Sequence, residues 1–266
     1  MGQKMKNAPV YFTIAQVRHN PVLSLEAYIS GIQESFRKAG YPDFKKAISM
    51  AFNLTPTINN DNLQTQPLPM QQVERYIFSN MDSMRGFILQ QNALSYQATE
   101  YGTFELFSSE FLKGLKIVHD SVTIDFSERI GVRYLDAVIP KPEESLKQYL
   151  VPGVMGLSSD LQNNVLIHSF TETLMQVPNI GQVIARTIIQ NGAVGFPPDL
   201  QPDSLKLAER FTTANQLHAV IDTDGSFEGR EAFDMQVIEN RLDNLHKEIS
   251  KAFRTMTTDY ARKSWN

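Results

Sequence analysis

Two arginines on one predicted strand are the residues whose type and spacing first indicate ligand chemistry. Arg129 and Arg133 lie four residues apart, with Gly131 midway between them. Side chains alternate along a strand, so both guanidinium groups point to one face, and Gly131 adds no side chain that would crowd a phosphate or carboxylate. The pattern predicts an anion-binding pair. The commoner alternative is that both arginines pair with acidic residues of neighbouring strands.

A second candidate is the acidic run Asp222-Thr-Asp-Gly, which ends a short apolar strand. Asp222 and Asp224 could supply oxygen ligands to Mg²⁺ or Ca²⁺. The run does not fit a calcium-binding EF-hand loop, because Phe227 and Phe233 stand where that loop needs Gly and Glu. A turn in which the aspartates bond nearby backbone N–H groups is the more common arrangement, so a metal at Asp222 and Asp224 is the weaker prediction.

Other familiar catalytic patterns are missing from the sequence. The chain has no cysteine, which excludes disulfides, thiol catalysis and cysteine-ligated metals. It has no Gly-x-Ser-x-Gly motif and no phosphate-binding loop ending in Gly-Lys-Ser/Thr. Its five histidines fall on separate predicted elements. We therefore predict no catalytic residue and no cofactor, and the sequence leaves open whether the protein is an enzyme.

The predicted arginine strand lies in the middle of the chain. A helix is predicted over 103–119, because its large apolar residues recur every three or four positions. The strand over 128–139 follows, with Ile130, Val132, Tyr134 and Asp136 on the face opposite the arginines. We expect this strand to be a central element of the sheet.

The spacing of apolar and turn-forming residues in the rest of the chain predicts an α+β fold with mainly antiparallel sheets covered by long helices. The expected order is β-α-β-β-β-α-β over residues 1–140, with one strand over 86–98, and α-β-β-β-α over 141–266. The break at Pro140-Lys-Pro predicts two lobes, with one continuous domain as the alternative. The polar, proline-containing stretch 55–70 is predicted to be a surface loop whose role the sequence does not indicate.

A long helix is predicted at the C-terminus, over 231–265. Its apolar residues step by three and four and form one continuous stripe. Packing against the protein's own sheet is the usual role of such a stripe. If part of it stays exposed, it would form a dimer or partner surface, with Ile238, Leu242, Leu245 and Ile249 as the candidate interaction residues.

Composition narrows the classes of partner and compartment. The chain of 266 residues has a net charge of −4, and its sequence pI is about 5.8, so nucleic acid is not favoured as a partner. No signal peptide or apolar run long enough to span a bilayer is visible, so we expect no membrane partner. The lack of cysteine is typical of a reduced compartment, and a cytoplasmic location is expected.

Three stretches resemble a known family. They are Tyr101-Gly-Thr-Phe-Glu-Leu-Phe at the start of the helix predicted over 103–119, the strand Arg129-Ile-Gly-Val-Arg-Tyr-Leu-Asp-Ala-Val-Ile139, and the tail from Leu245-His to Trp265. In this order they resemble the sporadically distributed bacterial family of uncharacterised proteins with a central Gly-(Leu/Val)-Arg-Tyr strand and a C-terminal helix ending near Trp. Leu135-Asp136 departs from the Ile-Asn that is commoner there. The resemblance implies no activity, but the patchy distribution would fit mobile or defence-associated genes.

Two functions of different classes follow from these observations. The first is a non-enzymatic binding or regulatory protein that recognises a macromolecular partner, a protein above all, within a bacterial toxin–antitoxin or anti-phage system. A homodimer is a further alternative. The second is an enzyme or sensor for a phosphorylated small molecule or nucleotide, in which Arg129 and Arg133 hold the anion and Asp222 and Asp224 a metal. This second function requires the four side chains to converge on one cavity.

Overall fold

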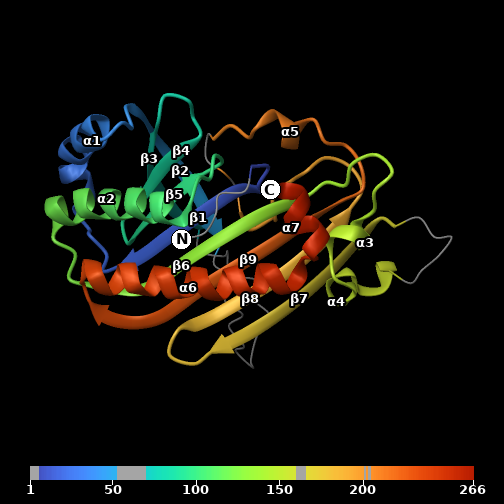
Figure 1. The fold of residues 1–266 in the computed structure, drawn as a ribbon. Helices are drawn as coiled ribbons and strands as arrows, with labels where there is room; N and C mark the ends of the chain where they lie inside the picture. Colours follow the sequence, from blue (N-terminus) through green and yellow to red (C-terminus); the bar gives the residue numbers. More distant parts are fainter. Residues whose placement is uncertain (1–5, 53–69, 160–165, 201, 203–204) are drawn as a thin grey trace, which may run out of the picture.

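The computed structural model describes residues 6–52, 70–159, 166–200, 202 and 205–266. Within them the strands form one antiparallel sheet in the order β2-β3-β4-β5-β1-β6-β9-β8-β7 (Figure 1). An α+β fold built on a large antiparallel sheet is thereby confirmed. The strands are β1 (Val10–His19), β2 (Asp43–Phe52), β3 (Met70–Ser79), β4 (Arg85–Gln90), β5 (Ala93–Ala98), β6 (Phe126–Val138), β7 (His168–Val177), β8 (Gly181–Gln190) and β9 (His218–Ala232).

The two halves of the chain follow the same plan and meet at the centre of the sheet. In each half the first strand, β1 or β6, lies beside the last, β5 or β9, and the others continue outward. The strands β1 and β6 pair with each other and join the halves. The predicted arginine strand is β6, which pairs with β1 on one side and β9 on the other. The predicted boundary after residue 140 groups β6 with the first half, whereas in the sheet order β6 is the first strand of the second half.

Two long helices lie across one face of the sheet, which we call the helix face (Figure 1). They are α2 (Phe104–Val122) and α6 (Met235–Met256), and each follows the last strand of its half. The Thr103 side chain caps α2 by accepting from the N–H of Leu106, and the Asp234 carboxylate caps α6 by accepting from two first-turn N–H groups. These caps satisfy donors that a helix start leaves without partners, so both helices begin at defined positions.

The remaining helices are shorter. They are η1 (Leu25–Tyr28), α1 (Ile29–Lys38), α3 (Leu146–Tyr149), α4 (Pro152–Met155), η2 (Gly156–Ser159), α5 (Glu209–Thr212) and α7 (Asp259–Trp265). Of these, α1 packs on the helix face against β3 and β4, and α5 belongs to the connection between β8 and β9. No helix among the described residues is long and apolar enough to cross a membrane.

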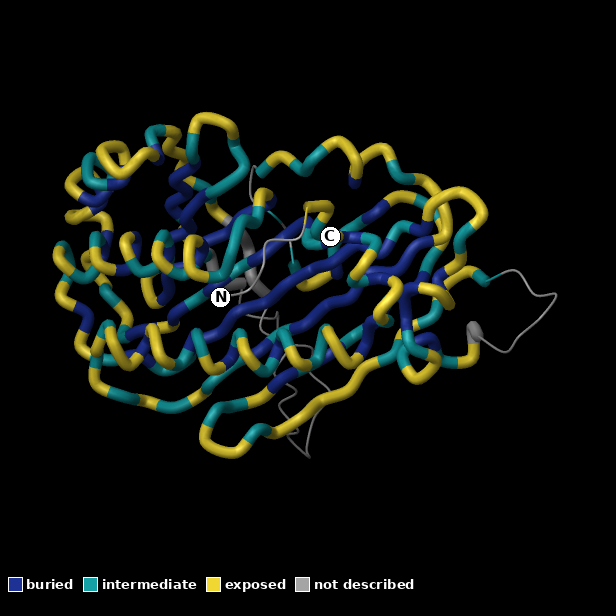
Figure 2. The backbone as a smooth tube through the Cα atoms, viewed as in Figure 1, coloured by how far each residue is buried: buried dark blue, intermediate teal, exposed yellow. Residues whose placement is uncertain are grey.

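The opposite face of the sheet, which we call the open face, is covered in part by the connection between β8 and β9. Val194, Phe196 and Phe211 of this connection pack against Tyr11 and Phe12 of β1. The Tyr11 hydroxyl donates a hydrogen bond of 2.6 Å to the carbonyl of Gly195. Burial is accordingly greatest along the central strands, whereas β7 is mostly exposed (Figure 2).

Several predicted elements differ from the structure. The strand predicted over 86–98 is the hairpin β4–β5, in which Gln90 pairs with Ala93 across a two-residue turn. The predicted C-terminal helix is divided, because Thr257 adopts an extended conformation and forms a β-bridge with Leu150. Nearly all of the loop predicted over 55–70 lies outside the described residues.

The turn predicted at Asp222-Thr-Asp-Gly is wrong. These residues lie inside β9, which continues to Ala232 and pairs with β6 and β8. Gly225 serves helix packing, since a Cβ there would lie 3.0 Å from the Ile249 side chain of α6. The glycine of the Asp-Gly pair is therefore needed because α6 packs closely against β9. A sequence pattern typical of turns cannot show this long-range contact.

Candidate functional site

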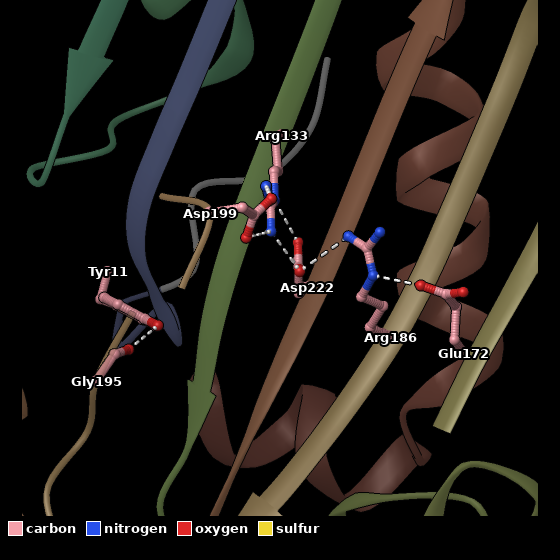
Figure 3. A network of polar contacts seen from close by, with 7 residues as sticks. All are labelled: Tyr11, Arg133, Glu172, Arg186, Gly195, Asp199 and Asp222. Atoms are coloured by element: carbon pink, nitrogen blue, oxygen red, sulfur yellow. Dashed lines mark hydrogen bonds and ion pairs between the residues drawn. The ribbon is translucent and has the colours of Figure 1, made fainter. Parts of the chain in front are cut away.

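Two of the residues singled out in the sequence, Arg133 and Asp222, meet on the open face in a network of arginines and carboxylates (Figure 3). Arg133 donates to both carboxylate oxygens of Asp222, over 2.7 and 2.8 Å. It also donates to both oxygens of Asp199 in the β8–β9 connection, over 2.7 and 3.2 Å. Burial opposes the charge of Arg133, but the hydrogen bonds that it donates to Asp222 and Asp199 outweigh burial and raise the pKa of the guanidinium.

The network continues outward across β8 and β7. Arg186 donates to Asp222 over 3.2 Å and to Glu172 over 2.6 Å (Figure 3). Asp222 is completely buried and lies between two guanidinium groups. Asp199, Arg133, Asp222, Arg186 and Glu172 thus form one row of alternating carboxylates and guanidinium groups. Bidentate pairing holds such planar groups in a defined geometry, so this row fixes the alignment of neighbouring strands. The positive charge of Arg133 is already balanced within the protein.

Arg129 shares the open face with Arg133 but has weaker partners. Its guanidinium lies across Gly131, where a Cβ would be 2.9 Å from the arginine Nη1. It lies 3.7 Å from the carboxylate of Glu228 and 3.4 Å from the side-chain oxygen of Gln16. The space that Gly131 leaves open is therefore filled by Arg129 itself. An anion clamp formed by Arg129 and Arg133 would require both groups to leave these positions.

The predicted metal ligands occupy the same row. Asp222 is held by Arg133 and Arg186, and Asp224 pairs in register with Arg133 on the neighbouring strand. Burial raises the pKa of Asp224, while Arg129 and Arg133 lower it. In the part of the chain that the structure describes, no three His, Asp or Glu side chains gather closely enough to hold a metal ion. Two carboxylates with arginine neighbours do not form a typical magnesium or calcium site.

The interaction surface proposed on the C-terminal helix is wrong. Ile238, Leu242, Leu245 and Ile249 are each at most 3% exposed. They belong to the core cluster between α6 and the sheet, together with Val132 of β6 and Leu115 of α2. The stripe is covered because α6 packs against the chain's own strands, so these four side chains stabilise the fold and are not available to a partner.

A free edge of the sheet exposes apolar side chains that the sequence reading had not singled out. Within the described residues, the strand β7 is the last in the sheet order and pairs with β8 alone. Phe170 and Leu174, on its open-face side, are 54% and 59% exposed. Met175, on the helix-face side, is 36% exposed and lines an apolar cavity of about 260 Å³ with Val183 and Ala252. An edge of this kind is suited to pairing with another strand.

A cavity on the helix face lies between the start of α2, the middle of α6 and the centre of the sheet. Its volume is about 220 Å³. The Tyr134 hydroxyl is hydrogen-bonded to Nδ1 of His246 at 3.0 Å and lies 3.5 Å from the Tyr101 hydroxyl. The Phe104 ring stacks on His246 with the centroids 4.0 Å apart. Burial lowers the pKa of His246 to about 4, so its ring is neutral at pH 7.

Two polar side chains in this cavity have no hydrogen-bond partner among the residues that the structure describes. Asp136 is only 7% exposed, and no described residue donates a hydrogen bond to its carboxyl group. Burial, with a smaller contribution from the negative charge of Asp222, raises the pKa of Asp136 to about 8. Thr223 is completely buried, and its hydroxyl has no partner. Buried polar groups are nearly always satisfied, so a pair without partners in one cavity marks a place for a ligand or ordered water.

The cavity opens beside a larger groove between the two long helices. The groove has a volume of about 1170 Å³ and shares Phe104, Glu105, His246, Ser250 and Arg254 with the cavity. The three sequence stretches that carry the family resemblance also meet here, since they contribute Tyr101, Tyr134 with Asp136, and His246. The feature of the sequence that could have indicated this cavity is the carboxylate of Asp136 on an otherwise apolar strand face.

Comparison with known proteins adds no functional information. No protein-family model matches the chain, and no curated protein matches it. The family resemblance therefore stays a prediction.

Proposed function

We propose that this protein is a non-enzymatic binding protein that recognises an extended segment of another protein along the free edge of β7. The supporting observation is that β7 exposes Phe170, Leu174 and Met175 beside an unpaired strand edge. A segment added to this edge would gain main-chain hydrogen bonds from the strand and apolar contacts from the side chains, as in strand addition to other sheets.

The other edge of the sheet supports this choice by contrast. The described part of β2 also exposes Phe44 and Ile48, but it carries the charged residues Asp43, Lys45 and Lys46 among them. Lys46 lies 3.1 Å from both Glu26 and Glu74. Charged side chains discourage the addition of a further strand. On β7 the only acidic or basic residue besides His168 is Glu172, which Arg186 already holds.

The β7 edge also offers a receptive surface on the helix face. The apolar cavity of about 260 Å³ beside Met175 is formed where α4, β7, β8 and α6 meet. A large apolar side chain of an added strand would fill it and contribute about 1.5–3 kcal/mol through burial. Specificity would come from this side chain, whereas the main-chain hydrogen bonds would hold the segment in register. The role in a bacterial toxin–antitoxin or anti-phage system belongs to the same proposal and depends on the partner's identity.

The test is affinity capture with a variant of the edge. The protein and the double variant Phe170→Glu/Leu174→Glu are used as baits, and bound proteins are identified by mass spectrometry. The matched control is Leu23→Glu/Met81→Glu, since Leu23 and Met81 are 86% and 79% exposed and lie outside β7. We expect one partner to bind the wild type and the control and to be lost from the β7 variant. Thermal unfolding verifies that all three remain folded.

The partner segment, once identified, is titrated into each protein. The proposal is contradicted if the β7 variant binds it as tightly as the wild type does. It is also contradicted if light scattering shows a dimer that only the β7 variant dissociates, because the edge would then be occupied by a second copy of the chain.

A further inference from the structure

The two polar groups without partners in the cavity beneath α6 point to a second binding site, separate from β7. We propose that this cavity binds a small organic amine in its ammonium form, with Asp136 as the counter-ion and the Thr223 hydroxyl as an additional acceptor. Both side chains line the cavity, and both are more than nine-tenths buried. An ammonium group carries three donors and no acceptor, so it can satisfy both oxygen-bearing groups at once.

The walls of the cavity favour a cation with an apolar body. Tyr101, Phe104, Tyr134 and Phe253 line it together with His246. The face of an aromatic ring attracts a cation, and the attraction increases when water is excluded. A carboxylate in the same enclosure makes a bare anion unfavourable, because like charges repel at short range in a poorly solvated site. The combination therefore selects for an ammonium group attached to an aromatic or aliphatic body.

The size of the cavity limits the ligand. Its volume of about 220 Å³ is below the roughly 300–1,000 Å³ that is typical of drug-sized sites. A single ring with a short aminoalkyl arm matches this space. A larger substituent would have to extend past Arg254 and Glu105 into the groove between α2 and α6.

Among the described residues, the groups facing Asp136 include no competing cation at the bottom of the cavity. Tyr134 extends from β6, Tyr101 precedes α2, and His246 extends from α6. Burial raises the pKa of both phenols and lowers that of the imidazole, so all three are neutral at pH 7. Asp222 belongs to the open face and adds negative charge from β9. The charged groups that the described residues place at the exposed rim are Glu105 and Arg254.

This arrangement gives ammonium binding a characteristic dependence on pH. The pKa of Asp136 without ligand is raised by burial to about 8, so at pH 7 the carboxyl group holds a proton. Binding of an ammonium group displaces that proton, because the carboxylate then gains a charged partner. The apparent affinity is expected to rise about tenfold per pH unit up to pH 8 and to level off above it.

The experiment is calorimetric titration of the full chain with benzylamine, with benzyl alcohol and benzoate as neutral and anionic comparisons. The variants are Asp136→Asn, Thr223→Val and, as a matched control, Asp82→Asn, which changes an exposed carboxylate outside the cavity. We expect benzylamine to bind at least about tenfold tighter than benzyl alcohol, and Asp136→Asn to weaken it at least about tenfold. Thr223→Val is expected to weaken it by a smaller factor, and Asp82→Asn to leave it unchanged.

Three results would overturn the proposal. The first is the absence of saturable benzylamine binding at millimolar concentration. The second is binding of benzyl alcohol as tightly as benzylamine, which would mean that the site takes neutral ligands. The third is unchanged affinity in Asp136→Asn, or an affinity that does not vary between pH 6 and 8. Circular dichroism and thermal unfolding of Asp136→Asn separate loss of the site from loss of the fold. Because β7 takes no part in this cavity, either outcome leaves the strand-edge proposal standing.

Discussion

Asp136 and Asp222 lie on adjacent central strands and are both buried, but they have opposite surroundings. Asp222, on the open face, is 0% exposed and forms salt bridges with Arg133 and Arg186. Asp136, on the helix face, is 7% exposed and receives no hydrogen bond from any described residue. In the register of β6 with β9, Asp222 pairs with Leu135, the residue next to Asp136. One step along a strand therefore separates two different electrostatic environments.

The comparison shows that burial alone does not decide what a carboxyl group does. At Asp222 two guanidinium groups offset the cost of removing a charge from water, and the result is an internal structural element. At Asp136 no such group is present, and the pKa rises to about 8 by burial. On the open face Asp222 is paired with Arg133 and Arg186, whereas on the helix face no described residue pairs with Asp136, which leaves a polar site for a ligand. Substitutions on either side test this difference.

The largest effect is expected from Asp222→Ala. Removal of the carboxylate takes the one fully buried acceptor from Arg133 and Arg186, which then keep only Asp199 and Glu172, two carboxylates that are 63% and 43% exposed. The loss of one partner from a buried ion pair typically costs about 3–5 kcal/mol. Urea denaturation should show a decrease of that size in the free energy of unfolding. As a control, Glu172→Ala removes a half-exposed partner of Arg186 and should cost less than about 1 kcal/mol.

A similar decrease in both variants would contradict the central place of Asp222 in the row. A further test is the double variant Arg133→Met/Asp222→Leu, which removes both charges. It should be more stable than Asp222→Ala, because no buried charge is left without its partner.

A smaller, pH-dependent effect is expected from Asp136→Asn. The folded pKa of about 8 lies above the unfolded value of about 3.8, so between these values the folded state binds the extra proton. Wild-type stability therefore decreases as pH rises through this window, and the loss ends above pH 8. Asparagine cannot ionise, so the variant should gain about 2 kcal/mol relative to wild type between pH 6 and 8.

Urea denaturation at several pH values measures this difference. The Asp82→Asn variant, which changes an exposed carboxylate, should show no comparable trend. If the difference between Asp136→Asn and wild type is flat from pH 5 to 9, Asp136 is not the buried acid described here, and the contrast with Asp222 is lost.

The smallest effect is expected from Arg129→Met, which compares the two arginines of β6. Arg129 lies 3.7 Å from Glu228, whose side chain is 75% exposed, whereas Arg133 is held over 2.7 Å by the completely buried Asp222. An ion pair with one partner in water contributes about 0–1 kcal/mol. The change in unfolding free energy should fall in that range, and an effect as large as that of Asp222→Ala would show that the two arginines act as one unit.

Some of this architecture could be read from the sequence because its signals are local. The alternation over 128–139 placed Arg129 and Arg133 on one face of a strand and Asp136 on the other. The apolar stripe containing Leu242 and Leu245 indicated a helix, and packing on its own sheet was its usual role. In both cases residues close in the chain define the period, and the side-chain direction follows from backbone geometry.

The sequence by itself determined the kinds of elements and the faces on which their side chains lie, since periodicity is a property of neighbouring residues. The tertiary structure decided which charges meet, because β9 pairs with β6 and thereby brings Asp222 to Arg133 across 89 positions. It also decided that Asp136 has no partner and that β7 ends the sheet. Those outcomes depend on strand order and register, which arise from contacts between distant parts of the chain and leave no local pattern.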